Sequence, residues 1–458
     1  MRIPTPRSCS GILLLLVLMF AGSAAAADLV SATADYLKKD YAKAFSGFRA
    51  LAEIGQPTAQ FDLAIMYRNG EGTRPSDIYA YAWASLAAEN GLEKAKVLAD
   101  ELRPGLAPGS ERIAADIEAQ FGNAVLDARL NPRIVDGIGN RSACRRLRSY
   151  IPPYPPDALV KGVEGAAYAE FTVMPDGHTR IPRIIYAVPT GFFEAATRYS
   201  LLHTKFVPPA DGKPEQCTIF FQFLLEGVTG PSQELEVFVN QTLTHARAGD
   251  PNAQMLYGML LVGLPQLNKP RSQALPWFLK SAQAGTPAAQ YQVGYSLLKG
   301  WGCDCEENKG LDWLRRAAQS GQPDAEVTLA MYALRGHPDE ERLRQAKLWL
   351  EQAAASDNHD GKLYLAALLA ASPDPASRDS KRALTLLDDV FRGVRDDPIA
   401  FEIRAAAQAS AGQYAEAVTS ESKAVAMAKN LFWEIAPLNE RLSSYSAKQP
   451  WYGELLDF

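Results

Sequence analysis

Apolar and polar side chains alternate between Gly165 and Val173, a pattern that predicts a β-strand with one buried face. The apolar positions of this stretch are Ala167, Ala169, Phe171 and Val173. A tight turn at Pro175–His178 leads into a second strand that ends near Val188. Pro182 has no backbone N–H to donate within that second strand, so we expect an edge position or a bulge there.

Two further elements complete this part of the chain. Apolar residues recur at helical spacing from Phe192 to Leu202, which predicts a helix. The sequence CTIFFQFLL then predicts a last strand, in which Ile219, Phe221 and Phe223 share one face. Residues 150–226 therefore predict a small α+β module with the order helix, strand, strand, helix, strand.

A longer period governs the rest of the chain. Gly249, Gly285 and Gly321 stand 36 residues apart, and a fourth step of 36 reaches Asp357. A proline follows each of the three glycines by two residues. Glycine tolerates the left-handed turn that ends a helix, and proline suits the first position of the next helix. Each 36-residue unit therefore predicts two helices joined by tight turns.

The same unit occurs earlier, between Gly55 and Gly91, but Gly55 and Gly249 are 194 residues apart, which is not a multiple of 36. The repeats therefore form two arrays separated by the module. Every unit carries a tryptophan in the same register: Trp83, Trp277, Trp313 and Trp349. We interpret these rings as the structural core of the repeats, each packed against small residues of neighbouring helices. Their shared register disfavours the alternative, a ladder of ligand-binding rings.

The N-terminus has the features of a secretory signal. Arg2 and Arg7 precede the apolar run Ile12–Phe20, and small residues follow at Ala24–Ala27. We expect cleavage near Ala26 or Ala27. The formal net charge of −5 becomes −7 once the two arginines leave, and this charge argues against a nucleic-acid partner. The mature chain is expected to be soluble in an oxidising extracytoplasmic space.

Four cysteines remain once Cys9 leaves with the signal, and four cysteines allow three pairings. We favour a disulfide between Cys144 and Cys217, because Cys144 lies just before the module and Cys217 opens its last strand. Cys303 and Cys305 form a C-x-C pair, which has too few thiols for a structural zinc site. We expect a local disulfide between these two, with a redox-sensitive pair as the alternative.

The 36-residue pitch, the G-x-P opening and the W-x-x-x-A-A close resemble Sel-one-like repeats, which are related to tetratricopeptide repeats. Residues 399–429, which contain the sequence AGQYAEAV, are similar to a plain tetratricopeptide unit. Such arrays are scaffolds that bind protein segments, so the resemblance implies interaction and not catalysis. The chain is expected to be mainly α-helical: an α-solenoid of two-helix repeats in two arrays, with the α+β module inserted between them. The expected domains are the signal peptide 1–27, Sel-one-like repeats 34–102, a helical connector and loop 103–149, the module 150–226, Sel-one-like repeats 235–370, and a tetratricopeptide-like repeat with a C-terminal cap at 380–458.

The module resembles the C-terminal domain of the TonB family. The residues that carry this resemblance are Tyr154, Pro155, Ala158, Gly162, Gly165, Phe171, Val173, Asp176, Gly177, Gly191, Ala196, Phe206 and Pro208. The family's domain lies in the periplasm of Gram-negative bacteria, where its final strand pairs with a short segment of an outer-membrane transporter. The resemblance implies that Thr218 to Leu225 binds a partner by strand addition. The residues of this partner-binding edge strand would be Thr218, Phe220, Gln222 and Leu224.

The sequence offers no catalytic motif. Its five histidines form no metal-binding pattern, and it contains no phosphate loop and no dinucleotide fingerprint. We therefore expect a non-enzymatic periplasmic scaffold with no catalytic, cofactor-binding or metal-binding residues and no small-molecule substrate. Its partners would be proteins of the cell envelope, an outer-membrane transporter among them. A hydrolase acting on the cell wall is a third hypothesis, for which the sequence nominates no nucleophile.

A TonB-like energy transducer, held in the inner membrane by an uncleaved N-terminal segment, is the main alternative. Transducers of that family cross the periplasm on a long proline-rich spacer, whereas the 30 prolines of this chain are scattered. The family's tryptophan before the Phe-x-Pro element is also absent, because Thr204 and Lys205 precede Phe206. These departures favour the scaffold.

Overall fold

The computed structural model describes residues 29–458 apart from 54, 108, 136–143, 226–232, 265–266, 268, 270, 337, 394–396, 454 and 457–458. The signal peptide expected at residues 1–27 lies outside the described residues. The described part is mostly helical, with a small sheet inserted between helical arrays, which confirms the expected fold class.

Two compact units make up the fold. Among the described residues, the first unit comprises those within 29–139, 249–255 and 275–325, and the second unit comprises those within 140–248, 256–274 and 326–458. Two helices, α11 (Pro251–Gly263) and α15 (Pro323–Leu334), contribute residues to both units. The domain boundaries expected from the sequence follow a different division of the chain and stay a prediction.

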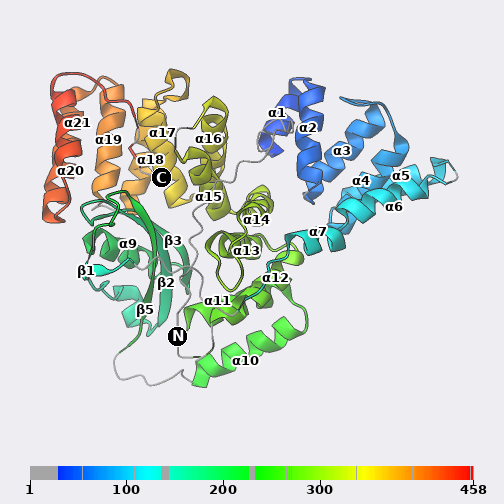
Figure 1. Cartoon of the computed structure of the whole chain (residues 1–458), viewed down its shortest axis with the longest axis horizontal. Helices are drawn as coiled ribbons and strands as arrows, with labels where there is room; N and C mark the ends of the chain where they lie inside the picture. The colour runs from blue at the N-terminus through cyan, green and yellow to red at the C-terminus, as the bar shows by residue number, and fades with distance from the viewer. Residues whose placement is uncertain are drawn as a thin grey trace. The chain divides into compact units, whose positions relative to one another are not determined.

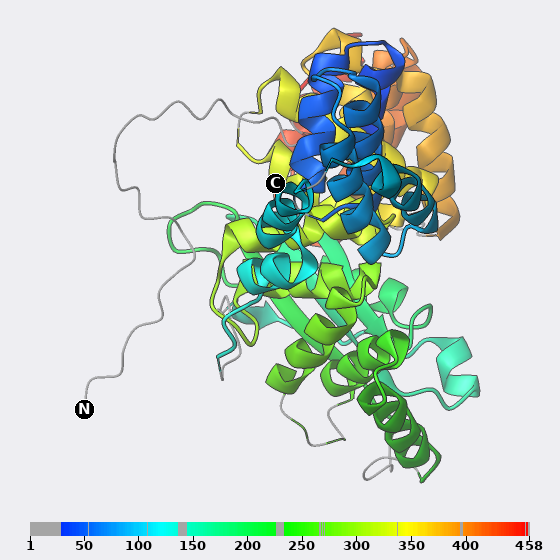
Figure 2. The same ribbon diagram turned by 90° about the vertical axis from the view of Figure 1, so that its right-hand side faces the viewer.

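Antiparallel helix pairs build the first unit. The helices α1 and α2 stand side by side in both views (Figures 1 and 2), and α3, α4 and α5 follow in sequence, each packed on the helix before it. The bounds of the helices in this unit are α1 Leu29–Leu37, α2 Tyr41–Ala52, α3 Pro57–Asn69, α4 Asp77–Glu89, α5 Glu93–Leu102, α6 Glu111–Phe121, α7 Asn123–Leu130, α12 Leu275–Gln283, α13 Pro287–Lys299 and α14 Glu307–Gln319.

The repeat glycines lie where the chain turns between helices. Gly55, Gly91, Gly285 and Gly321 all have positive φ angles, between 79° and 92°, a conformation that glycine adopts without strain. The fourth step of the second array is taken by Asp357, which keeps the same turn with a φ of 61°. The spacing of 36 residues therefore reflects a helix that ends at a residue with positive φ in each of these repeats.

The second unit combines the inserted module with the later helices. Its strands are β1 Arg146–Arg148, β2 Gly165–Val173, β3 Thr179–Val188, β4 Lys205–Phe206 and β5 Glu215–Phe223. Its helices besides α11 and α15 are α8 Pro156–Val160, α9 Glu194–His203, α10 Gln233–Arg247, α16 Glu340–Ala355, α17 His359–Ala371, α18 Ser380–Gly393, α19 Pro398–Ser410, α20 Tyr414–Asn430 and α21 Ala436–Ser446. The module therefore contains the predicted order helix, strand, strand, helix, strand.

The main sheet has the order β3-β2-β5, with both neighbouring pairs antiparallel, and β1 pairs with β4 in a separate two-stranded sheet. Pro182 lies in β3, which is an edge strand of the main sheet, as its missing donor predicts. The register of β2 and β3 also shifts twice along their length. One face of the sheet packs on α9 and a core that includes Phe171, Phe193 and Phe206.

The expectation that β2 has only one buried face is wrong. All nine residues of β2 are buried, including Glu170 and Thr172 on the polar side. The second face is covered because helices of the same unit pack on it. Arg183 of β3 donates to Thr328 Oγ1 of α15 at 2.8 Å and lies 3.6 Å from the Glu170 carboxylate.

The four repeat tryptophans differ in burial. Trp83, Trp313 and Trp349 are at most 5% exposed, whereas Trp277 is half-buried with the Lys280 ammonium 4.9 Å from its ring centroid. Trp313 also donates its indole N–H to the carbonyl of Leu130 at 2.9 Å. That hydrogen bond ties α14 to the last residue of α7 within the first unit.

Candidate partner-binding site

The candidate edge strand β5 lies at one side of the main sheet. It pairs with β2 over its whole length, from Gly165 opposite Phe223 to Val173 opposite Glu215. Among the strands that the structure describes, β2 is the one neighbour of β5. Gln222 is exposed and Leu224 is 49% exposed, while Thr218 and Phe220 are half-buried.

Side chains hold the two ends of this strand. Arg335 donates to Gln216 Oε1 at 3.1 Å near its start. The carboxylate of Glu164 accepts the backbone N–H of Leu225 at 2.8 Å just beyond its end. The backbone between these two points, Cys217 to Leu224, includes every residue that the sequence nominated for partner binding.

The opposite edge of the sheet, β3, is occupied by the chain's own helices. Arg180 forms a two-point ion pair with Glu402 of α19, at 3.1 and 3.2 Å, and donates to the carbonyl of Leu455 at 2.9 Å. Arg198 of α9 pairs with Asp360 of α17 at 3.0 Å. These arginines are not among the residues that the sequence nominates for the site. A signal was available, because Arg180 and Arg183 flank Pro182 in an otherwise apolar strand.

Glu402 is the centre of a buried charge cluster, which we define as Arg180, Glu402, Glu421 and Arg441. Glu402 is fully buried, and Arg441 of α21 donates to its second oxygen at 2.5 Å. Arg441 also pairs with Glu421 of α20 at 3.2 Å. Burial raises the pKa of Glu421 to about 8, so this carboxyl group is mostly protonated at neutral pH. The Glu402 carboxylate therefore contacts two buried guanidinium groups.

The turn before β3 contacts the loop between α20 and α21. His178 stacks on Trp433 with ring centroids 4.5 Å apart and forms a hydrogen bond to Asp176. Asp176 also accepts the backbone N–H of Glu434 at 2.6 Å. Although burial opposes its ionisation, these hydrogen bonds lower the pKa of Asp176 to about 2. Burial lowers the pKa of His178 below its ordinary value of 6.5.

We expect this contact to be sensitive to acid. The unfolded chain binds a proton at His178 near pH 6.5, whereas the folded chain binds it only at lower pH, so stability falls as the pH decreases through 6.5. Asp176 adds a second loss between about pH 4 and pH 2, where the unfolded carboxylate is protonated first. Urea unfolding midpoints measured from pH 8 to pH 5 should fall for the wild type. In the His178→Gln variant, the dependence of stability on pH should be weaker, by an amount that corresponds to at most one bound proton. An unchanged dependence would contradict the assignment of this effect to His178.

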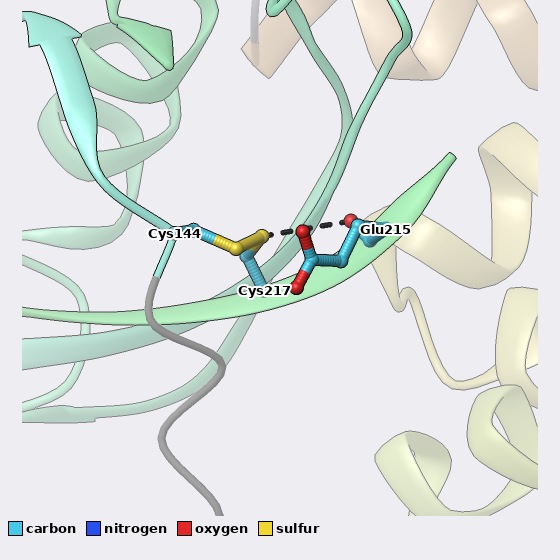
Figure 3. A group of neighbouring side chains, drawn as sticks. All are labelled: Cys144, Glu215 and Cys217. Atoms are coloured by element: carbon cyan, nitrogen blue, oxygen red, sulfur yellow. Dashed lines mark hydrogen bonds between the residues drawn. A yellow bond between two sulfur atoms is a disulfide. The ribbon is translucent and has the colours of Figure 1, made fainter. Parts of the chain in front are cut away.

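The disulfide between Cys144 and Cys217 forms as expected, with a Cα–Cα distance of 6.0 Å. Figure 3 shows that it joins the segment before β1 to β5, beside Glu215. The two sulfur atoms and the Glu215 carboxylate lie within 4.8 Å of one another, a spacing that a metal ion could use. Both sulfurs are engaged in the disulfide, however, so they are not thiolate ligands.

The expected local disulfide between Cys303 and Cys305 is wrong, because Cys303 is a free buried thiol. Each sulfur faces a different carbonyl of α13: Cys303 Sγ lies 3.5 Å from the oxygen of Ser296, and Cys305 Sγ lies 3.3 Å from that of Leu298. The two side chains therefore point to successive positions along the helix. Burial raises the pKa of Cys303 to about 12, so its reactive thiolate form is suppressed, which also disfavours a redox-sensitive pair.

Comparison with protein families identifies the class of both parts. The family model described as Sel1 repeat matches residues 57–92, 251–286, 287–322 and 323–358. The model described as Gram-negative bacterial TonB protein C-terminal matches residues 151–225. The chain therefore carries four Sel1 repeats and a TonB C-terminal domain between the repeat arrays, as the sequence resemblance predicted.

Three examples represent the solved structures that are similar to the chain. A Sel1 repeat protein from Oxalobacter formigenes is 16% identical, with 80% of this chain and 99% of that chain covered and a TM-score of 0.32. The protective antigen c5321 of uropathogenic Escherichia coli, which displays an SLR fold, is 16% identical, with 91% and 83% covered and a TM-score of 0.35. The TonB C-terminal domain of Pseudomonas aeruginosa is 29% identical, with 20% and 96% covered and a TM-score of 0.18. No curated protein matches the chain.

These families define a coarse function. Sel1 repeat proteins are protein-interaction scaffolds, and the TonB C-terminal domain is an interaction module of the Gram-negative envelope. Both families are non-catalytic. Within residues 29–458 as described, no helix combines the length and apolar character needed to cross a bilayer.

Proposed function

We propose that this protein is a non-enzymatic periplasmic scaffold that binds a segment of another envelope protein as an added strand on β5. The observation that carries the proposal is the sheet order β3-β2-β5, in which β5 forms an edge of the sheet in the described part of the chain. An edge strand offers backbone N–H and C=O groups that an incoming extended segment can satisfy. The two family assignments support a protein partner.

The two edges of the sheet support a single docking side. Ion pairs from Arg180 to Glu402, and hydrogen bonds from Arg183 to Thr328, hold β3 against the helices of the second unit. We therefore expect a partner strand to dock on β5 and not on β3. The partner's side chains would meet those of Thr218, Phe220, Gln222 and Leu224 at alternate positions.

Site-specific photo-crosslinking tests the proposal. A photoreactive residue placed at Gln222, which is exposed on β5, should crosslink in cells to one envelope protein, and mass spectrometry should locate the bond in an extended segment of that partner. A synthetic peptide of this segment should bind the purified chain. N-methylation of alternate peptide bonds should abolish binding, because strand addition uses every second N–H.

The matched control is Val160 of α8, which is 87% exposed in the same module but lies outside the sheet. A photoreactive residue there should give at least tenfold less of the same product. Equal crosslinking from Val160 and Gln222, or a peptide that tolerates N-methylation at every position, would contradict strand addition.

The TonB-like energy transducer remains a second candidate because the same edge strand would serve it. The candidates differ at the N-terminus, where a transducer keeps residues 12–20 as an anchor. Sequencing the N-terminus of the protein purified from cells separates them. The scaffold predicts a start near Ala27 or Asp28, and a mature chain that retains Ile12–Phe20 would favour the transducer.

A further inference from the structure

A polar pocket of about 330 Å³ opens in the first unit, where the turns of two repeats meet. The turn between α2 and α3 contributes one side, and the turns around α12, α13 and α14 contribute the other. Amide side chains dominate its lining, and we call it the amide pocket. Its lining includes Asn90, Gln290, Gln319 and Ser320.

Equivalent positions of two repeats show why the amide pocket is unusual. Gln60 and Gln290 each stand five residues after a repeat glycine, and each donates its amide N–H to the carbonyl eight residues earlier, at 3.2 and 3.4 Å. In the first array the oxygen of Gln60 is also satisfied, because Asn90 donates to it at 2.9 Å. Both the nitrogen and the oxygen of the Gln60 amide are therefore hydrogen-bonded within that repeat.

The second repeat lacks the closing donor. Ser320 stands where the first repeat has Asn90, one residue before the glycine that ends the helix. The Gln290 side chain is 5% exposed, and its Oε1 is buried without a hydrogen-bond partner among the described residues. Burying an acceptor without a hydrogen-bond partner is unfavourable, so a ligand that donates to it gains binding free energy.

Gln319 supplies a second set of open groups in the same pocket. Both its amide nitrogen and its amide oxygen are buried without a partner in the described part of the chain. A side-chain amide with both groups open can donate to and accept from one peptide group at the same time. Gln290 and Gln319 together offer two acceptor oxygens and one donor nitrogen to a ligand.

We propose that the amide pocket binds the main chain of an extended peptide segment, with one peptide group paired to Gln319 and one N–H donated to Gln290. The described lining contains one acidic residue, Glu89, and one basic residue, Arg316, so it favours a neutral group. The same described lining has no aromatic ring on which a sugar could stack. The volume of about 330 Å³ lies at the lower end of the range for ligand pockets and suits two or three small residues. This site is separate from β5 and does not depend on strand addition.

The internal comparison supplies the test. Ser320→Asn gives the second repeat the donor of the first, and the backbone already suits it, since Ser320 has φ −92° and ψ 12° where Asn90 has φ −80° and ψ 13°. Full-length protein labelled with ¹⁵N-glutamine is titrated with N-acetyl-trialanine amide, which presents only main-chain polar groups. The side-chain NH₂ signals of Gln290 and Gln319 should shift in the wild type. In the Ser320→Asn variant, the introduced asparagine amide should pair with Gln290 and weaken peptide binding at least tenfold.

Ser320→Ala is the matched control, because it leaves the pocket open and should bind as the wild type does. Thermal unfolding should show Ser320→Asn at least as stable as the wild type, so a loss of binding does not reflect misfolding. Absence of any shift in the wild type, equal binding by Ser320→Asn, or shifts caused by N-acetylchitobiose but not by the peptide would each overturn the proposal. Crosslinking from Gln222 should be the same in both variants, so failure here is distinct from failure of strand addition.

Discussion

Replacing Glu402 with glutamine should destabilise the second unit by about 3–5 kcal/mol. Glu402 is fully buried and carries the negative charge that both Arg180 and Arg441 contact. Glutamine keeps the shape but leaves two buried guanidinium groups without an ionised partner. Urea unfolding should show a lower midpoint, and hydrogen exchange should increase in β3, because the contact between Arg180 and Glu402 holds that strand to α19.

Glu421→Gln is the matched control within the same charge cluster. Burial raises the pKa of Glu421 to about 8, so at pH 7 the glutamine replaces a carboxyl group that is already mostly neutral. We expect a loss of no more than about 1 kcal/mol, the cost of a neutral hydrogen bond. If the two variants lose the same stability, Glu402 is not the charge that holds the cluster together.

Removing the disulfide, by Cys144→Ser with Cys217→Ser, should destabilise the module by about 4 kcal/mol. The crosslink joins residues 73 apart, and the loop-entropy model gives a stabilisation of this size for such a loop. Cys217 is fully buried against the core that includes Phe171 and Phe206, so local loosening should reach β5 as well. Thermal unfolding and limited proteolysis with and without a reductant measure the effect.

Cys303→Ala is the control for this experiment, because Cys303 is buried but is not part of a disulfide. It should lose about 1 kcal/mol, the cost of a small cavity, and should remain sensitive to reductant. The double serine variant should lose the part of this reductant sensitivity that the Cys144–Cys217 bond contributes. A wild type whose unfolding temperature does not change on reduction would show that the crosslink contributes little.

The helical repeats could be predicted from the sequence because their determinants are local. Gly285 needs a positive φ, and Pro287 suits a first helical position whatever the surroundings. The same holds for Pro182, whose missing N–H restricts β3 to an edge. Even Asp357, which breaks the glycine pattern, keeps the turn that the spacing of 36 predicts.

The environment of the candidate site could be predicted only in part. The alternation in β2 predicts a solvent-facing side, but Glu170 on that side is buried beside Arg183. Arg180 and Glu402 are 222 residues apart, and no local pattern signals that they meet. Trp277 keeps the register of its counterparts yet is half-buried, because burial depends on which helices pack nearby. A turn can be predicted from residues at a fixed spacing, whereas contacts between residues far apart in the sequence produce no such local pattern.

The position of the disulfide has a mechanical consequence. Force applied by a partner that grips β5 would act along the strand, where the hydrogen bonds to β2 resist sliding together. Cys217 is the third residue of β5, and its bond to Cys144 carries tension directly into the segment before β1. The Cys144–Cys217 disulfide would therefore share the force applied to β5 with the hydrogen bonds between β5 and β2.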